Sequence, residues 1–236
     1  MNQLPTTIAI DGPAASGKTT VGLLLAKELG YLCLDTGVFY RALTAEAISS
    51  KLDPLDEEAI TEMAYTAQIR VAAPSRCGQE LSVLVNEHDL SAKLRTSRVN
   101  RWVSEVSAYP GVRLAILNLQ RQVGEQGKII LLGRDIGSVV LPNAACKIYL
   151  TASAEERAKR RFQEERAMRS GLSYAEILES IRHRDELDSS RTTAPLKAAD
   201  DAYILNTDGL NPEEVVAEIL RYIQFSCPEI KVPNSD

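Results

Sequence analysis

The sequence is poor in the residues that build disulfide frameworks and metal centres. It holds four cysteines and two histidines among 236 residues, and no two cysteines stand in C-x-x-C spacing. Two of the cysteines, Cys33 and Cys146, fall inside apolar strand-like runs, which favours buried free thiols over disulfides or zinc ligands. His88 and His183 have no partner at the spacing of a metal site or a catalytic triad, so neither is assigned a role.

Long apolar runs and an excess of positive charge are also missing. No apolar segment approaches the roughly 20 residues that cross a membrane, and residues 1–7 lack the basic and apolar pattern of a secretion signal. We therefore expect a cytoplasmic protein. The 27 basic residues stand against 32 acidic ones, a net charge of −5 that argues against a nucleic-acid partner held by bulk charge. Any anion site must come from a local basic cluster.

What the chain does contain is a glycine-rich loop between a strand and a helix. Residues 12–19 read G-P-A-A-S-G-K-T, after an apolar run and before a helical pattern, which is the context of a phosphate-binding P-loop. Gly12 and Gly17 let backbone N–H groups turn toward a phosphate that also lies at the positive end of the helix dipole. Lys18 can then reach the β- and γ-phosphates of ATP, and the Thr19 hydroxyl can ligate Mg²⁺. The predicted ATP-binding loop is Gly12, Pro13, Ala14, Ala15, Ser16, Gly17, Lys18, Thr19 and Thr20.

Strands alternate with helices along most of the chain. Strands are predicted at residues 8–10, 31–34, 128–132, 145–150 and 203–206, and helices at 20–29, 38–50, 57–67, 96–108, 110–125, 154–168, 174–188 and 212–225. This order indicates a parallel α/β sheet with ligands beyond the carboxyl ends of its strands. Two adjacent strands, at residues 68–72 and 81–86, break the alternation and predict a small antiparallel insertion over about residues 68–95.

Charged and hydroxyl side chains gather in three segments, of which the first two directly follow predicted strands. The three groups are Asp35, Thr36, Tyr40 and Arg41; Arg134 and Asp135; and Arg182, Arg184, Asp185, Asp188 and Arg191. In the third group, the spacing of Arg184, Asp188 and Arg191 places them within two turns of one helix face. Arginines suit phosphoryl transfer because its transition state spreads charge over equatorial oxygens. The alternative is a solvated helix face with ion pairs, and the P-loop upstream favours the phosphate site.

A second set of arginines lies on two polar helices separated by Gly171. These residues are Arg157, Arg160, Arg161, Arg166 and Arg169. Helices of this kind can form a lid that closes over ATP and excludes water, which would otherwise accept the phosphoryl group. An exposed ion pair is the alternative for each arginine, and we assign Arg157 and Arg161 to ATP.

Four motifs together resemble those of the bacterial cytidylate kinases, a family of P-loop nucleoside monophosphate kinases. They are the P-loop, D-T-G-V-F-Y-R at 35–41, G-R-D-I-G-S at 133–138 and R-D-E-L-D-S-S-R at 184–191. The likeness runs over about residues 7–222, and the last two motifs are far more specific than the P-loop. It implies a three-layer α/β P-loop kinase fold with a parallel sheet, in a single domain over residues 1–236. The parts would be a core (7–56, 96–156 and 192–225), an NMP-binding insertion (about 57–95) and a helical lid (about 157–191).

The resemblance also implies an activity and a set of site residues. The activity is ATP- and Mg²⁺-dependent phosphorylation of CMP and dCMP to CDP and dCDP by a monomer. Arg41, Arg134 and Arg191 would hold the CMP phosphate, Arg184 and Asp188 the sugar, and Ser104, Arg113 and Asp135 the cytosine, with Thr36 also in the CMP site. Lys18, Arg134 and Arg191 would be the catalytic residues.

Chemistry alone supports the choice of base. Cytosine offers an N4 amino donor that the Asp135 carboxylate can accept, and its N3 and O2 acceptors suit Arg113 and Ser104. Uracil reverses the pattern at position 4 and at N3, which would leave buried polar groups unpaired. The sequence therefore predicts a strong preference for CMP and dCMP over UMP.

The chain departs from the family pattern at three places. Leu132 stands where an acidic residue often precedes G-R-D, Asn206 replaces an aspartate at the end of the last strand, and residues 86–89 differ from the usual turn. Two other functions stay open: a P-loop kinase for another nucleoside monophosphate or for shikimate, and a GTP-binding switch protein. The switch protein is disfavoured because the sequence has neither an N-K-x-D nor a D-x-x-G motif.

Overall fold

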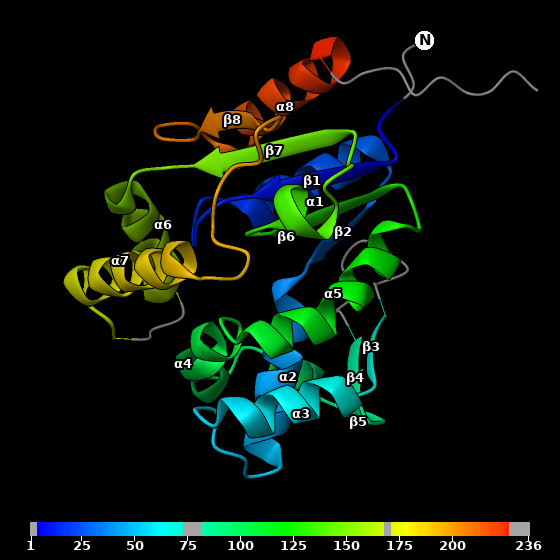
Figure 1. Cartoon of the computed structure of the whole chain (residues 1–236). Helices are drawn as coiled ribbons and strands as arrows, with labels where there is room; N and C mark the ends of the chain where they lie inside the picture. Colours follow the sequence, from blue (N-terminus) through cyan, green and yellow to red (C-terminus); the bar gives the residue numbers. More distant parts are fainter. Residues whose placement is uncertain (1–3, 73–81, 168–170, 227–236) are drawn as a thin grey trace, which may run out of the picture.

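The computed structural model describes residues 4–72, 82–167 and 171–226 and confirms the parallel α/β sheet (Figure 1). Five strands pair in parallel in the order β2-β6-β1-β7-β8. Their bounds are Leu32–Asp35 (β2), Ile129–Gly133 (β6), Thr7–Asp11 (β1), Cys146–Thr151 (β7) and Tyr203–Asn206 (β8). Because all five strands run the same way, the segments that follow them meet at one edge of the sheet.

Helices cover both faces of this sheet. Alternate strand residues point to opposite faces, so Ile8 and Ile10 pack toward α1 (Lys18–Leu29) and α8 (Pro212–Ser226), with the buried core of that side. Ala9 between them joins the core on the other face, which α5 (Pro110–Gly124) helps to cover. The result is the predicted three-layer arrangement.

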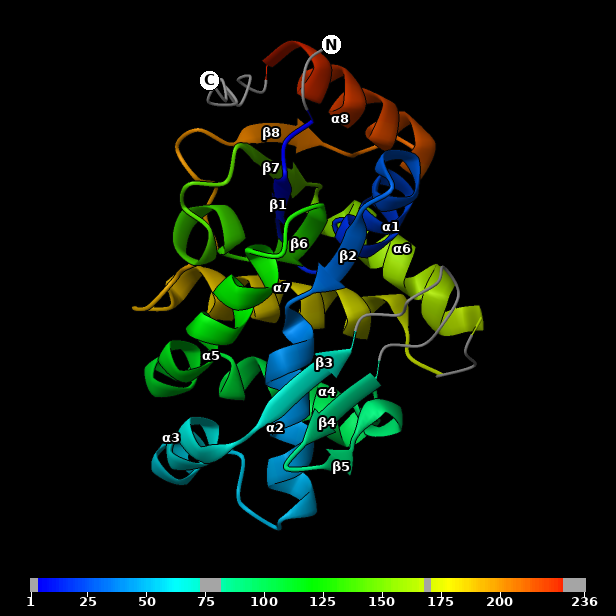
Figure 2. The same cartoon turned by 90° about the vertical axis from the view of Figure 1, so that its right-hand side faces the viewer.

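A smaller antiparallel sheet lies apart from the large one, beside α2 (Figure 2). Its strands are β3 (Ile69–Ala72), β4 (Ser82–Val85) and β5 (His88–Asp89), which together confirm the predicted insertion. The two-residue strand β5 was not predicted, because it is too short to show a periodic pattern. It follows a turn in which Asn86 (φ 48°) and Glu87 (φ 66°) are both left-handed, the geometry of a two-residue hairpin turn.

The remaining helices surround these two sheets. Their bounds are Gly37–Ser49 (α2), Glu57–Thr66 (α3), Ser97–Val106 (α4), Ala154–Ala167 (α6) and Tyr174–Ser190 (α7), with a short 3₁₀ turn at Ser91–Lys93. Helices α6 and α7 pack on each other beyond the carboxyl ends of the strands through a small core centred on Ala158, Ile177 and Ile181 (Figure 1). Met168, predicted at the end of α6, lies outside the described residues. No helix in the described part of the chain is both long and apolar enough to span a membrane.

A π-helical turn at Ile136–Val140 directly follows the G-R-D motif and was not predicted. Its backbone N–H groups bond five residues back, from Val140 to Asp135 (3.1 Å) and from Leu141 to Ile136 (2.7 Å). Such turns are rare and are often found at functional sites. This one sets the path of the chain just after Arg134 and Asp135.

Candidate active site

The P-loop connects β1 to α1 at the carboxyl edge of the sheet, where the sequence placed it. Gly12 has a φ of 148°, and a Cβ there would lie 2.0 Å from the carbonyl oxygen of Leu150. Gly17 (φ 92°) caps the start of α1, and Ala15 (φ 59°) adopts the left-handed region between them. The positive φ angles at these three positions curve the loop, so that its backbone N–H groups can form a concave binding site for an anion.

Gly12→Ala is expected to destabilise the protein strongly, because the new methyl group would overlap the Leu150 carbonyl. Strain and overlap together cost about 3 kcal/mol, which lowers Tm by roughly 6–12 °C in a chain of this length. Thermal unfolding measures this shift. Gly30→Ala is the matched control, since Gly30 also has a positive φ (68°) but a Cβ there meets no atom within 4 Å. Equal losses in the two variants would contradict the close approach at Gly12.

Lys18 is buried at the start of α1 and turned back onto the loop. Its Nζ donates to the carbonyl oxygens of Gly12 (2.8 Å) and Pro13 (2.6 Å) and to the Ser16 hydroxyl (3.3 Å). Burial, and then the nearby Arg134 guanidinium, lower the pKa of Lys18 well below its ordinary value. No carboxylate hydrogen-bonds this ammonium among the described residues, so the phosphates of a nucleotide would be its natural counter-ions.

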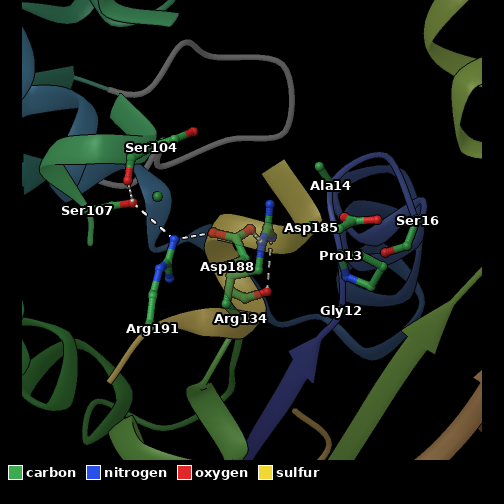
Figure 3. Close-up of polar contacts among 12 residues, drawn as sticks. Gly12, Pro13, Ala14, Ser16, Ser104, Ser107, Arg134, Asp185, Asp188 and Arg191 are labelled. Atoms are coloured by element: carbon green, nitrogen blue, oxygen red, sulfur yellow. Dashed lines mark hydrogen bonds and ion pairs between the residues drawn. The ribbon is translucent and has the colours of Figure 1, made fainter. Parts of the chain in front are cut away.

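On the other side of the site, Asp188 joins two of the predicted arginines (Figure 3). Its carboxylate accepts from Arg134 Nε (2.9 Å) and from Arg191 Nη2, and Arg191 also donates to the Ser107 hydroxyl (3.2 Å). Burial raises the pKa of Asp188, but Arg134, Arg191 and Arg184 outweigh it and hold that pKa below its ordinary value. One carboxylate therefore orients several guanidinium groups without neutralising them all.

The structure corrects the placement of Arg191. The sequence put it on the same helix face as Arg184 and Asp188, but α7 ends at Ser190 and Arg191 has the extended ψ of 135°. Its side chain reaches back to Asp188 from the segment after the helix. The spacing correctly predicted that Arg191 lies near Asp188, but it wrongly placed Arg191 on the helix.

Three predicted arginines have a buried Nε with no hydrogen-bond partner among the described residues: Arg113, Arg184 and Arg191. Burial, and then Arg134, lower the pKa of Arg184 to about 10, so several positive charges crowd together here. Buried donors in folded proteins are nearly always paired. An excess of unpaired guanidinium donors is the property expected of a site that binds an anionic, oxygen-rich ligand.

Two of the residues predicted to recognise the cytosine base, Arg113 and Asp135, form an ion pair with each other. Arg113 Nη2 donates to Asp135 Oδ2 (2.5 Å), and both side chains are almost fully buried. Arg113 also donates to the carbonyl oxygen of Ser107 (3.0 Å) and lies over the Tyr40 ring, 5.4 Å from its centre. Ser104 lies one turn before Ser107, whose hydroxyl donates to the Ser104 carbonyl (2.9 Å). A donor, an acceptor and an aromatic face thus meet in one buried place.

Arg41 and Thr36 lie at the start of α2, where β2 leads into the same site. Arg41 Nη1 donates to the Leu94 carbonyl (3.0 Å) and to Asn100 Oδ1 (2.6 Å). The buried Thr36 hydroxyl donates to the carbonyl oxygen of Leu132 (2.9 Å) and so fastens β2 to β6. Arg41 therefore joins the arginine group from the side of the antiparallel insertion.

Arg157 and Arg161, the two arginines of α6 that the sequence analysis assigns to ATP, differ in position. Arg157 is buried, donates to both oxygens of Asp185 (3.0 and 2.6 Å) and reaches the carbonyl of Ala14 in the P-loop (3.2 Å). Arg161 is exposed and pairs with Glu164 and Glu165 on its own helix. The structure thus brings Arg157 to the predicted ATP loop but not Arg161, and Arg169 lies outside the described residues.

The residues present can accommodate Mg²⁺ beside a nucleotide. Thr19 is exposed in the first turn of α1, next to Lys18, and Asp35 ends β2 near enough for its charge to raise the pKa of Lys18. No group of three acidic, histidine or cysteine ligands occurs in the described segments. Mg²⁺ typically binds through few protein ligands, phosphates and waters, so this sparse donor set fits an ion held mainly by ATP.

Two departures from the family pattern have structural explanations. Leu132 is buried between β6 and α1, where a Cβ on Gly22 would come 2.8 Å from its side chain. Leu132 thus packs its apolar side chain against Gly22 of α1, at the position where the family often has an acidic residue. Asn206 accepts from the backbone N–H of Asp208 (3.0 Å) and shapes the turn after β8.

Comparisons with known proteins show the family of the chain. A family model described as cytidylate kinase matches residues 8–225. The chain belongs to the cytidylate kinase family. It is 47% identical over 220 residues to a cytidylate kinase of Herpetosiphon aurantiacus, covering 93% of this chain and 94% of that protein. A cytidylate kinase of Carboxydothermus hydrogenoformans is 45% identical over 216 residues, covering 92% and 96%.

A solved structure of the shikimate kinase from Acinetobacter baumannii in complex with shikimate shares the fold. It superposes with a TM-score of 0.50 at 17% identity and covers 94% of each chain. At that identity the likeness concerns the architecture alone. It agrees with the predicted P-loop kinase fold.

Several residues of the site were not singled out from the sequence. Asp11 binds two backbone N–H groups of the π-helical turn, Ser107 holds Arg113 and Arg191, and Asn100 holds Arg41. For Asp11 a signal existed, since it is an acidic residue at the end of an apolar strand. Ser107 and Asn100 carry no such signal, because their roles depend on how α4 packs against α2 and α7.

Proposed function

We propose that the protein transfers the γ-phosphoryl group of ATP to CMP and dCMP, giving CDP and dCDP. The observation that carries this proposal is the group of arginines whose buried Nε donors have no partner among the described residues, and which lies across the site from the P-loop. A kinase for a nucleoside monophosphate must hold two polyanions together, and this site offers one cradle for each. Family membership at 40% identity or more agrees with this substrate class.

In this reaction an oxygen of the CMP phosphate attacks the γ-phosphorus in line, and the bond to the β-phosphate oxygen breaks as ADP leaves. Lys18 would contact the β- and γ-phosphates, and Arg134 and Arg191 would neutralise charge between donor and acceptor. Mg²⁺, when bound through the ATP phosphates and Thr19, supplies further charge stabilisation. No covalent enzyme intermediate is needed.

The acceptor would bind through three groups of side chains. Arg41, Arg134 and Arg191 hold its phosphate, and Arg184 and Asp188 hold its sugar. Asp135, Arg113 and Ser104 read the cytosine, which would replace part of the direct Arg113–Asp135 contact seen here. Thr36, which directly follows β2, would support this site by holding β2 against β6 through the bond from its hydroxyl to the Leu132 carbonyl.

The division into parts follows from the same proposal. Residues 57–95 would form the NMP-binding insertion and residues 157–191 the lid, with Arg157 and Arg161 acting on ATP as the lid closes. One chain supplies every proposed site residue, so we also propose that the protein acts as a monomer, and in the cytoplasm, where free nucleotides are its substrates.

A coupled assay of ADP release tests the activity. With ATP and Mg²⁺, we expect ADP to form rapidly when CMP or dCMP is the acceptor. With UMP at equal concentration, ADP should form at least about a hundredfold more slowly. No ADP should form with shikimate or without an acceptor. The pairing of cytosine with Asp135 is the reason for this order. Rapid turnover of shikimate or another nucleoside monophosphate, or GTP hydrolysis with no acceptor, would contradict the proposal.

A further inference from the structure

The last residue of β1, Asp11, links the two halves of the site. It immediately precedes the P-loop and is 4% exposed. Its Oδ1 accepts from the backbone N–H of Ile136 (2.8 Å) and its Oδ2 from that of Gly137 (2.7 Å). These two N–H groups begin the π-helical turn that follows Arg134 and Asp135. One carboxylate thus joins the phosphate-binding loop to the loop that carries the predicted acceptor-binding residues, through a contact to Ile136, 125 residues away in sequence.

We propose that Asp11 is a positioning residue that fixes Arg134 and Asp135 against the P-loop and thereby sets the affinity for the acceptor. The inference rests on the proposed function, in which those two side chains touch CMP. Asp11 itself would contact neither substrate. It acts through the backbone of residues 136–137.

The geometry explains why an ionised carboxylate is needed at this position. The first N–H groups of any helical turn lack partners within the turn, and here another strand supplies both. An aspartate offers two acceptor oxygens, whereas the isosteric asparagine offers one oxygen and an NH₂ group that cannot accept. Because a bidentate contact fixes orientation as well as distance, the loss of one bond would let the loop rotate.

The anchor itself is rigid. Asp11 lies in the central strand, paired with Gly133 on one side and Tyr149 on the other. Gly12, the next residue, packs against the Leu150 carbonyl. The loop at residues 134–137 therefore adjusts when this contact is lost, and the strand stays in place.

The charged surroundings make the contact sensitive to pH. The pKa of Asp11 is raised to about 6. Burial is the main cause and the Asp135 charge adds to it, whereas the two N–H bonds and the Lys18 charge act in the opposite direction. Tyr149, on the neighbouring strand, also faces the group. As pH falls through about 6, Asp11 gains a proton and loses acceptor strength toward one N–H. Base binding should weaken in that range.

Asp11→Asn tests the proposal, with Thr7→Val as the matched control. Thr7 lies on the same strand at its opposite end, and its hydroxyl donates to the Gly124 carbonyl (3.2 Å). Calorimetry with CMP alone and with ATP alone should show CMP affinity lowered about tenfold or more in Asp11→Asn, the effect of one lost bond to a charged acceptor. ATP affinity should change by less than about threefold, and Thr7→Val should change neither.

A pH series and hydrogen exchange complete the test. Cytidine is used in the pH series because it carries no phosphate that titrates near pH 6. Its affinity for the wild type should fall below pH 6, and Asp11→Asn should lack that fall. Amide exchange at Ile136 and Gly137 should be faster in Asp11→Asn than in Thr7→Val, with or without a ligand. If Asp11→Asn does not fold, Asp11→Glu, which keeps the charge but shifts it, is expected to lower CMP affinity and to keep the pH dependence.

Three results would overturn the inference, and a fourth would concern the function alone. Unchanged CMP affinity in Asp11→Asn, or equal losses for CMP and ATP, contradicts a positioning role. Unchanged exchange at residues 136 and 137 does so as well. A wild type that binds no CMP would instead refute the proposed function, and the exchange measurement would still decide whether Asp11 orders the loop.

Discussion

Lys18→Ala is expected to abolish phosphoryl transfer, with kcat lower by about 10³-fold or more, as when a charge-stabilising group is removed from such a site. Lys18 supplies the one ammonium at the P-loop, and its side chain bends onto the carbonyls of Gly12 and Pro13. Steady-state kinetics with ATP, Mg²⁺ and CMP measures the loss. A variant that keeps near-normal kcat would refute the role of Lys18.

Stability separates this catalytic effect from misfolding. Burial and the neighbouring Arg134 disfavour the charged form of Lys18, as its lowered pKa shows. Removing a buried charge held only by carbonyl and hydroxyl oxygens should leave Tm unchanged or raise it. Lys27→Ala, an exposed residue near the end of the same helix, is the matched control and should keep full activity. A large fall in Tm for Lys18→Ala would mean that the loop needs its lysine in order to fold.

Asp135→Asn is expected to erase most of the discrimination between CMP and UMP. The carboxylate only accepts hydrogen bonds, which suits the N4 amino group of cytosine, whereas an amide can also donate to O4 of uracil. The ratio of kcat/KM for CMP to that for UMP should fall by about a hundredfold, since one charged hydrogen bond is lost and one repulsion is relieved. Kinetics with both acceptors measures this ratio.

The choice of asparagine protects the fold. Asp135 and Arg113 form a buried ion pair, and removing one partner outright leaves an uncompensated charge, which typically costs about 3–5 kcal/mol. An amide oxygen still accepts from Arg113. Asp201→Asn provides the control, because Asp201 also pairs with a basic residue, Lys147, but is exposed and outside the site. An unchanged CMP to UMP ratio in Asp135→Asn would contradict the base-reading role.

Much of the fold could be predicted because its causes are local. The near-continuous apolar run at residues 128–132 is typical of a central parallel strand, and residues 129–132 lie in β6, in the interior of the sheet. Gly30 ends α1 with a φ of 68°, as a glycine after a helical stripe should. The π-helical turn escaped prediction because its first N–H groups, at Ile136 and Gly137, bond to Asp11 and not to a neighbour along the chain. That contact joins segments more than a hundred residues apart, so no local pattern records it.

The sequence by itself determined the P-loop, the parallel sheet and the chemical types gathered at its carboxyl edge, since spacing and hydrophobic period depend on neighbours along the chain. Only the tertiary structure decided which arginines share Asp188, which one reaches the P-loop and which stays on the surface. Arg157 and Arg161 lie four residues apart on one helix, yet the first is buried against Asp185 and the second is exposed. The partner of a long side chain depends on which elements pack beside it. For these two arginines, the partners are set by the way in which α6 and α7 pack at the edge of the sheet.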